Sequence, residues 1–169
     1  ILEAARCVPF IDNLSNIKPG QDVVVSGCGI IGLLAAELAK ASGARVAITG
    51  IEKDRDSRLK LAKERGFTPI IVSQEQGLHD LLQEGVVDLK GQAFGKNGKV
   101  DLLIECSGVP QMLAAAGLSV KLNGDICVIA TYPGDVALDG SLFTRSAHNM
   151  RGSMGSSKKD FEIAQKLLV

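Results

Sequence analysis

The sequence contains no tryptophan, a single tyrosine and only 4% aromatic residues, and its charges cancel, with 19 Lys and Arg against 19 Asp and Glu. Proteins that bind nucleic acid usually carry a basic patch and aromatic stacking surfaces, so the composition argues against such a partner. The longest apolar stretch ends at Glu37, well short of the roughly 20 residues that span a bilayer. We therefore expect a soluble, cytoplasmic protein with no membrane partner.

Cysteine and histidine are few and scattered, with no Cys-x-x-Cys pair and no histidine cluster among Cys7, Cys28, Cys106, Cys127, His79 and His148. A zinc site needs about four converging ligands, and this spacing offers none. We expect reduced, mostly buried thiols, with Cys28 and Cys106 acting as small apolar fillers and not as nucleophiles. A chain of 169 residues can bury roughly 70% of its unfolded surface, so one domain needs no disulfide or metal.

Glycine, by contrast, is abundant, and three glycines form the motif Gly27-x-Gly29-x-x-Gly32 one residue after a run of three valines. Gly27 would allow a tight turn, Gly29 would leave room for a pyrophosphate, and Gly32 would let the next helix lie close to the strand. The N–H groups of that helix's first turn, at Ile30 and Ile31, would face the phosphates. Because the motif joins a strand to a helix, it predicts a dinucleotide site.

Apolar periodicity alternates strands with helices along the rest of the chain. Strands are expected at 23–25, 45–49, 68–72, 100–106, 124–130 and 149–154, and helices at 1–16, 30–42, 59–65, 78–83, 111–121 and 158–169. This alternation predicts the α/β class, with a doubly wound parallel six-stranded sheet of Rossmann type in the order 3-2-1-4-5-6. We expect residues 1–169 to form one NAD(P)-binding domain, with uncapped terminal helices that belong to something larger.

The cofactor preference depends on the end of the second strand. NAD enzymes carry an acidic residue there, which bonds the ribose hydroxyls, but this sequence has Gly50. Basic side chains follow that would accept a 2′-phosphate, and acidic ones that would replace the missing acid: Lys53, Arg55 and Arg58, against Glu52 and Asp54. The sequence therefore allows NAD or NADP, with a slight preference for NADP.

Four segments resemble the coenzyme domain of the zinc-type medium-chain alcohol dehydrogenases, in particular the sorbitol and threonine dehydrogenase branch. They are KPGQDVVVSGCGIIGLLAAELAKASGA, RLKLAKERG, IECSG and RGSMGSSKKDFEIAQKLL. The resemblance implies an oxidoreductase that transfers a hydride between a nicotinamide and an alcohol or polyol, or its ketone or aldehyde. It also implies a homodimer or homotetramer, in which edge strands of the coenzyme sheets pair.

The resemblance further implies which residues would contact the cofactor. Cys106, Ser107 and Gly108 would line the adenosine side, and Ala130, Thr131 and Tyr132, with Ser153 and Met154, would approach the nicotinamide. These positions follow strands, and ligands of open α/β sheets bind at the carboxyl ends of strands. In this family a separate domain supplies most zinc ligands, so we expect zinc only in the intact enzyme and no catalytic residue in this chain. Glu3 matches a family glutamate at or beside the zinc, although Ala4 replaces the proline that often follows.

Two other classes of function remain open. A regulatory nucleotide-sensing module of Rossmann type would share the fold without the chemistry. A nucleotide-using enzyme of another class, such as a methyltransferase or a short-chain reductase, is the third reading. A short-chain reductase needs a Tyr-x-x-x-Lys pair, but the fourth residue after Tyr132 is Val136.

Overall fold

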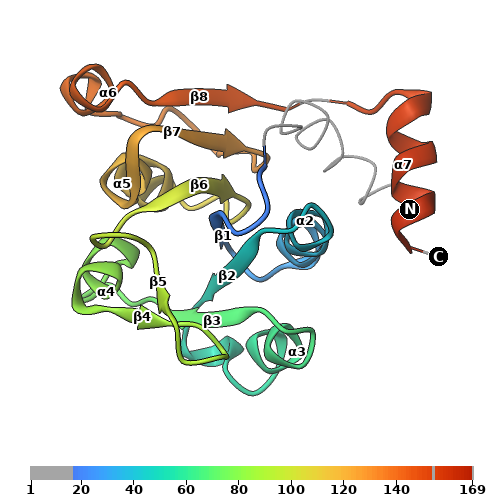
Figure 1. The fold of residues 1–169 in the computed structure, drawn as a ribbon. Helices are drawn as coiled ribbons and strands as arrows, with labels where there is room; N and C mark the ends of the chain where they lie inside the picture. Colours follow the sequence, from blue (N-terminus) through green and yellow to red (C-terminus); the bar gives the residue numbers. More distant parts are fainter. Residues whose placement is uncertain (1–16, 154, 169) are drawn as a thin grey trace.

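A six-stranded parallel sheet forms the centre of the computed structural model, which describes residues 17–153 and 155–168 (Figure 1). Its strands are β1 (Asp22–Ser26), β2 (Arg45–Gly50), β3 (Thr68–Ile71), β6 (Val100–Glu105), β7 (Val120–Val128) and β8 (Asn149–Gly152). They lie in the order β3-β2-β1-β6-β7-β8. This differs from the expected 3-2-1-4-5-6, because two short strands that the sequence did not reveal come fourth and fifth in the chain and lie outside the sheet.

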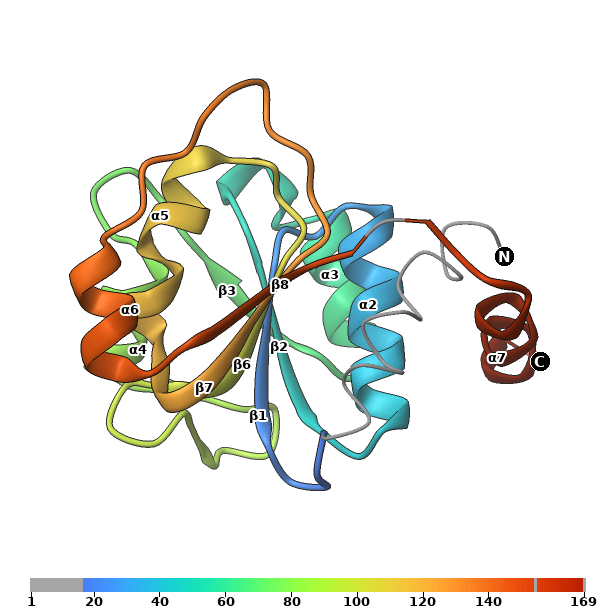
Figure 2. The same ribbon diagram turned by 90° about the horizontal axis from the view of Figure 1, so that it is seen from above.

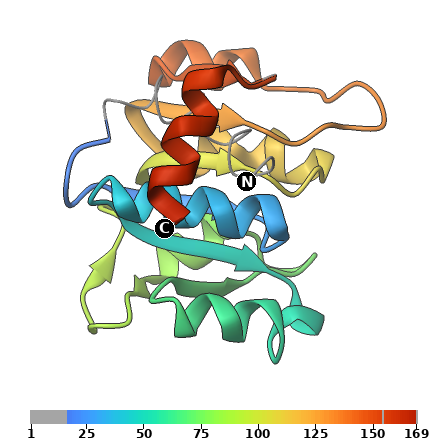
Figure 3. The ribbon, with the colours of Figure 1, turned by 90° about the vertical axis from the view of Figure 1, so that its right-hand side faces the viewer.

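Helices cover both faces of this sheet (Figure 2). One face carries α2 (Ile30–Ala41), α3 (Arg58–Glu64) and α7 (Lys158–Leu168), and the other carries α4 (Leu78–Glu84), α5 (Pro110–Ser119) and α6 (Gly140–Ser146). Figure 3 shows α7 (red) crossing in front of α2 (blue) at a steep angle, and Ala164 of α7 is fully buried in the core on this side. Within the described ranges, no helix is long and apolar enough to cross a bilayer.

The valine run of β1 explains why the sheet needs helices on both sides. Val23 and Val25 pack into the core under α2 and α3, whereas Val24 packs into the core under α4 and α5. All three side chains are fully buried, and burying one valine stabilises a fold by roughly 1.5–3 kcal/mol. The strand expected at 23–25 is confirmed, and it lies in the middle of the sheet with a core on each face.

Several boundaries differ from the sequence-based ones. Residues 85–99 contain an antiparallel pair, β4 (Val86–Val87) and β5 (Ala93–Phe94). Residues 133–147, where the sequence predicted neither a strand nor a helix, contain α6, because the Asp139 side chain accepts hydrogen bonds from the N–H groups of Ser141 (2.9 Å) and Leu142 (3.2 Å). Helix α5 ends earlier than expected and β7 begins earlier, while β8 stops at Gly152, short of the expected 154.

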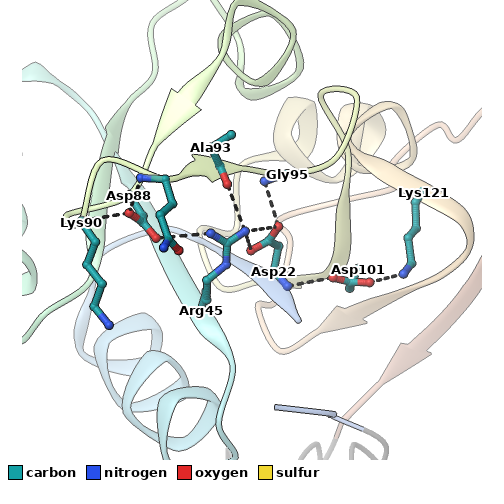
Figure 4. A network of polar contacts seen from close by, with 9 residues as sticks. Asp22, Arg45, Asp88, Lys90, Ala93, Gly95, Asp101 and Lys121 are labelled. Atoms are coloured by element: carbon teal, nitrogen blue, oxygen red, sulfur yellow. Dashed lines mark hydrogen bonds and ion pairs between the residues drawn. The ribbon is translucent and has the colours of Figure 1, made fainter. Parts of the chain in front are cut away.

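A polar network holds the amino ends of the strands, on the edge of the sheet opposite to the glycine motif (Figure 4). Arg45, at the start of β2, lies 2.6 Å from the Asp22 carboxylate and 3.3 Å from that of Asp88. Its guanidinium also donates to the Ala93 carbonyl at 3.0 Å. Asp22 accepts in addition from the Gly95 N–H at 2.9 Å. The network therefore fastens the β4–β5 pair to β1 and β2, which leaves the carboxyl edge for a site.

Candidate functional site

The candidate site lies where the connections of the sheet diverge. After β1 the chain crosses through α2 on one face, and after β6 it crosses through α5 on the other, while β1 and β6 are neighbours. Ser26, Glu105 and Val128 are paired side by side at the carboxyl ends of β1, β6 and β7. In open α/β sheets the crevice at such a switch point binds ligands.

The three glycines of the motif have three different surroundings. Gly27 has φ of +100°, and a Cβ there would lie 2.9 Å from the Cα of Ser107. A Cβ on Gly32 would lie only 1.9 Å from the carbonyl oxygen of Gly27, so the first turn of α2 touches the preceding turn backbone to backbone. A Cβ on Gly29 would meet nothing within 4 Å. Gly27 and Gly32 are thus required by packing, whereas Gly29 borders open space.

That open space adjoins the start of a twelve-residue helix. Gly29 is the N-cap of α2 and offers no side chain to bond the amide groups of the first turn. A helix N-terminus carries partial positive charge, and its amides are directed outward along the helix axis. Ile30, whose side chain is 67% exposed, follows directly, with Ile31 after it in the same turn. The arrangement suits an anion placed against bare backbone.

The loops after β6 and β7 form the neighbouring wall. The N–H of Cys106 donates to the Ser26 carbonyl at 2.9 Å, which brings the loop after β6 against the end of β1. Gly108 has φ of +69°, and a Cβ there would lie 3.1 Å from the Thr131 carbonyl oxygen. The fold therefore brings both sets of expected contacts, 106–108 and 130–132, onto adjacent loops. The N–H of Ser153, at the end of β8, donates to the Val128 carbonyl at 3.1 Å.

Sequence reasoning missed the residue on which these loops converge. Glu105 is fully buried at the end of β6, and its carboxylate accepts from the hydroxyls of Ser26 (3.2 Å), Ser107 and Tyr132. It also accepts from the N–H groups of Ser107 (2.9 Å) and Gly108 (3.4 Å). The available signal was a single carboxylate ending an otherwise apolar strand, because a buried carboxylate requires donors around it.

The one tyrosine of the chain does not present its hydroxyl to the crevice. Burial, followed by the hydrogen bond to Glu105 and the charge of Glu105, raises the pKa of Tyr132 above its ordinary value. The phenol therefore stays protonated and acts as a donor to the carboxylate. Tyr132 is thus unsuited to act as a general acid or base near neutral pH.

At the other end of the site, the structure shows why a glycine stands at position 50. A Cβ on Gly50 would lie 2.8 Å from the Cys28 sulfur and 3.0 Å from Leu59, so this position faces the core and has no room for an acidic side chain. Burial and the nearby Asp54 carboxylate raise the pKa of the Cys28 thiol, which fits its expected part as a filler. The first accessible positions for cofactor discrimination come after Gly50.

Those positions form a short charged segment over η1 (Glu52–Asp54) and the start of α3. Arg55 donates to both oxygens of Glu52, at 2.5 and 2.8 Å, and both side chains are exposed. Arg58 lies 3.5 Å from Asp54, whose side chain is buried and accepts from the Ile51 N–H at 3.2 Å. The exposed side chain of Lys53 completes the set of cations.

No three of the His, Cys, Asp and Glu side chains in residues 17–153 and 155–168 lie close enough together to hold a metal ion. The described residues therefore do not fit a catalytic zinc site. Glu3 and Met154 lie outside the described residues.

Comparisons with known proteins agree with this geometry. The profile of a family described as zinc-binding dehydrogenase matches residues 31–169. The chain belongs to the zinc-binding dehydrogenase family. A sorbitol dehydrogenase of Halalkalibacterium halodurans is 43% identical over 168 residues, which cover 98% of this chain and 46% of that protein. An L-threonine 3-dehydrogenase of Vibrio cholerae is 34% identical over 121 residues, or 71% of this chain and 32% of that protein.

A solved structure extends the similarity to three dimensions. A zinc-binding dehydrogenase of Sinorhizobium meliloti bound to NADP has a TM-score of 0.77 and 26% identity, covering 98% of this chain and 46% of that one. The 169-residue chain thus spans less than half the length of each of these three proteins.

Proposed function

We propose that residues 1–169 form the NAD(P)-binding domain of an oxidoreductase that transfers a hydride between nicotinamide and an alcohol or polyol, or its ketone or aldehyde. The observation that carries the proposal is the open space at Gly29, the side-chain-free N-cap of α2, at the carboxyl edge of the sheet. The similar sorbitol dehydrogenase and the NADP-bound structure support the substrate class and the cofactor class.

Each element of the site has a part in this proposal. The backbone of the glycine motif, with Ile30 and Ile31, binds the pyrophosphate. The loop after β6 lines the adenosine side, and the loop after β7, with Ser153 and Met154, lies at the nicotinamide. The bound dinucleotide supplies the hydride acceptor, and the chain orients it and shields one side of it from water.

The zinc chemistry implied by the family belongs to a part of the enzyme beyond the described residues. We propose that a separate catalytic domain provides most of the zinc ligands and that Glu3 lies at or beside that metal. No catalytic step is assigned to residues 17–153 and 155–168, since they do not fit a zinc ion.

Between the two dinucleotides we favour NADP. Gly50 has no room for the acidic side chain that would repel a 2′-phosphate, and Arg55 and Lys53 are exposed on the segment that follows. Exposed ion pairs contribute little, about 0–1 kcal/mol, so Arg55 can exchange Glu52 for a phosphate at small cost. A guanidinium binds phosphate with two parallel hydrogen bonds, which favours this exchange.

Calorimetric titration of the chain with NADPH, NADH and S-adenosylmethionine tests the proposal. We expect saturable binding of the two dinucleotides, tighter for NADPH, and none of S-adenosylmethionine. The reverse order of affinities would contradict the NADP preference, and binding of S-adenosylmethionine alone would contradict the oxidoreductase. The intact enzyme should then oxidise polyols or secondary alcohols with the same cofactor, as followed by nicotinamide absorbance; a nucleotide sensor would not.

We further propose a homodimer or homotetramer that pairs through β8. This strand ends the sheet, and Asn149, Arg151 and Gly152 on it are exposed. An edge strand presents backbone donors and acceptors that a second copy can bond. Sedimentation equilibrium should give a mass of at least two chains, whereas Met150→Pro should reduce it to one because proline removes a backbone donor from the strand.

A further inference from the structure

We propose that Glu105 is a positioning residue for the dinucleotide, and that the hydrogen bond between Tyr132 and Glu105 holds the nicotinamide-side loop in place. The inference rests on the proposed function, because it concerns the walls of that same site. The Glu105 carboxylate is buried beneath the crevice, so it acts on the cofactor only through the loops that it bonds.

Glu105 bonds all three parts of the wall. The Glu105 side chain accepts from Ser26 at the end of β1, and from Ser107 and Gly108 in the loop after β6. Its carbonyl oxygen accepts from the N–H groups of Ile129 (2.9 Å) and Ala130 (3.1 Å). The loop after β7 is then bonded a third time, through the Tyr132 hydroxyl.

The buried Glu105 carboxylate also limits which loop conformations are stable. Glu105 is fully buried, and five groups donate hydrogen bonds to its side chain. Three of them are hydroxyls and two are backbone N–H groups, and all five are uncharged. Removing a partner from a buried charged group is far more destabilising locally than removing a partner from an exposed one. The carboxylate therefore favours only those loop conformations that keep its donors in place.

The hydrogen bond from Tyr132 to Glu105 lies near the start of the long connection between β7 and α6. Residues 133–135 and 137–139 are exposed, and the next helix begins only at Gly140. Within this long connection the Tyr132 hydroxyl bonds a side chain that belongs to the sheet itself. Without that bond the backbone of 131–132, beyond the Ala130 N–H that bonds the Glu105 carbonyl, is free to move away from Gly108, whose neighbour is the Thr131 carbonyl.

The chain offers a direct probe of this contact, because Tyr132 is its only tyrosine and tryptophan is absent. Titration of tyrosinate by near-ultraviolet absorbance therefore reports on Tyr132 alone. In the wild type we expect ionisation only well above the ordinary tyrosine pKa of 10.0. In Glu105→Gln the pKa should fall toward that value. A wild-type Tyr132 that titrates like free tyrosine in the folded chain overturns the proposal, whether or not any cofactor binds.

Binding then separates positioning from stability, with NADPH compared with 2′-phospho-ADP-ribose (written ADP-ribose below), which lacks only the nicotinamide. For Tyr132→Phe we expect affinity for NADPH to fall by about tenfold and affinity for ADP-ribose to change less than about twofold, since only one loop is released. For Glu105→Gln we expect both affinities to fall, because Ser107 and Gly108 are released as well. Equal losses for both ligands in Tyr132→Phe, or no loss, would overturn the proposal.

Ser26→Ala is the matched control, since it removes one donor to Glu105 from the sheet and none from the loops. We expect it to lower the midpoint of thermal unfolding as much as Tyr132→Phe does, while leaving the ratio of NADPH to ADP-ribose affinity unchanged. If the wild type binds neither ligand, the proposed function fails, and the tyrosinate titration still decides whether Glu105 holds the loop.

Discussion

The sharpest prediction compares two glycines of the same motif, Gly29→Ala and Gly32→Ala. Both substitutions add one methyl group, at the N-cap of α2 for Gly29 and within the first turn of α2 for Gly32. The structure predicts opposite consequences, because the space around the two positions differs. Gly29→Ala should weaken dinucleotide binding and keep the stability of the fold, whereas Gly32→Ala should lower the stability of the fold.

For Gly29 the stability terms nearly cancel. Its φ of −70° and ψ of −178° suit any residue, so alanine gains about 0.4–1 kcal/mol from the reduced entropy of the unfolded chain. Alanine is a poorer N-cap than glycine, which loses roughly 0.5–1 kcal/mol. The free energy of unfolding should therefore change by less than about 0.5 kcal/mol, which shifts the unfolding midpoint by under ~2 °C in a chain of this size.

The Gly29 methyl should instead displace the ligand. It would occupy the open space that we assign to the pyrophosphate, and forcing a methyl into a filled site destabilises it by about 1–3 kcal/mol. We expect the dissociation constant for NADPH to rise on the order of a hundredfold, or about 2.7 kcal/mol.

Gly32→Ala meets a rigid obstacle. Its Cβ would lie 1.9 Å from the carbonyl oxygen of Gly27, so α2 must move away from β1. We place the loss near the upper end of overpacking effects, about 3 kcal/mol, which lowers the unfolding midpoint by roughly 6–12 °C. Circular dichroism melts and calorimetric titrations measure both quantities. Unchanged NADPH affinity in a folded Gly29→Ala chain would refute the assignment of the pyrophosphate site, and a Gly32→Ala chain as stable as wild type would refute the packing argument.

Three further predictions concern charge. Arg55→Ala should lower the affinity ratio of NADPH to NADH by about tenfold, since it removes a guanidinium that binds the 2′-phosphate, and competitive titration measures it. The pKa of Asp88 is lowered by hydrogen bonds from the N–H groups of Gln92 and Lys90 and by Arg45. The ionised Asp88 therefore stabilises the fold fully above the ordinary pKa of 3.8, and this stabilisation is lost as the pH falls through the lower pKa of the folded state. Thermal melts below pH 4 should show a smaller loss of stability with acid for Asp88→Asn than for the wild type. Burial raises the pKa of Cys127 to about 12 and also raises that of Cys28, so mass-mapped alkylation at pH 8 should leave both unmodified in the folded chain, and rapid labelling of either would contradict their burial.

Much of the fold could be predicted from residues that are neighbours in the chain. The valine run before Gly27 is covered on both faces of the sheet, as a continuous β-branched run predicts. Pro110 is the first residue of α5, a position that suits proline because the first N–H of a helix has no partner within the helix. The spacing of the glycines predicted the strand–turn–helix unit and the sharp turn at Gly27. These features depend on residues that are neighbours in the chain, so the sequence contains all the information they need.

The rest depended on partners that are distant in the chain. Glu105 and Tyr132 are 27 residues apart, and their contact requires β6 and β7 to pair in a particular register. The need for glycine at position 50 also comes from packing, because Cys28 and Leu59 leave no room there for a side chain. The β4–β5 pair depends likewise on Arg45, which reaches it from β2. Composition and periodicity fix which residues are buried and when the chain turns, whereas the direction in which each polar group finds its partner is decided only when the strands come together.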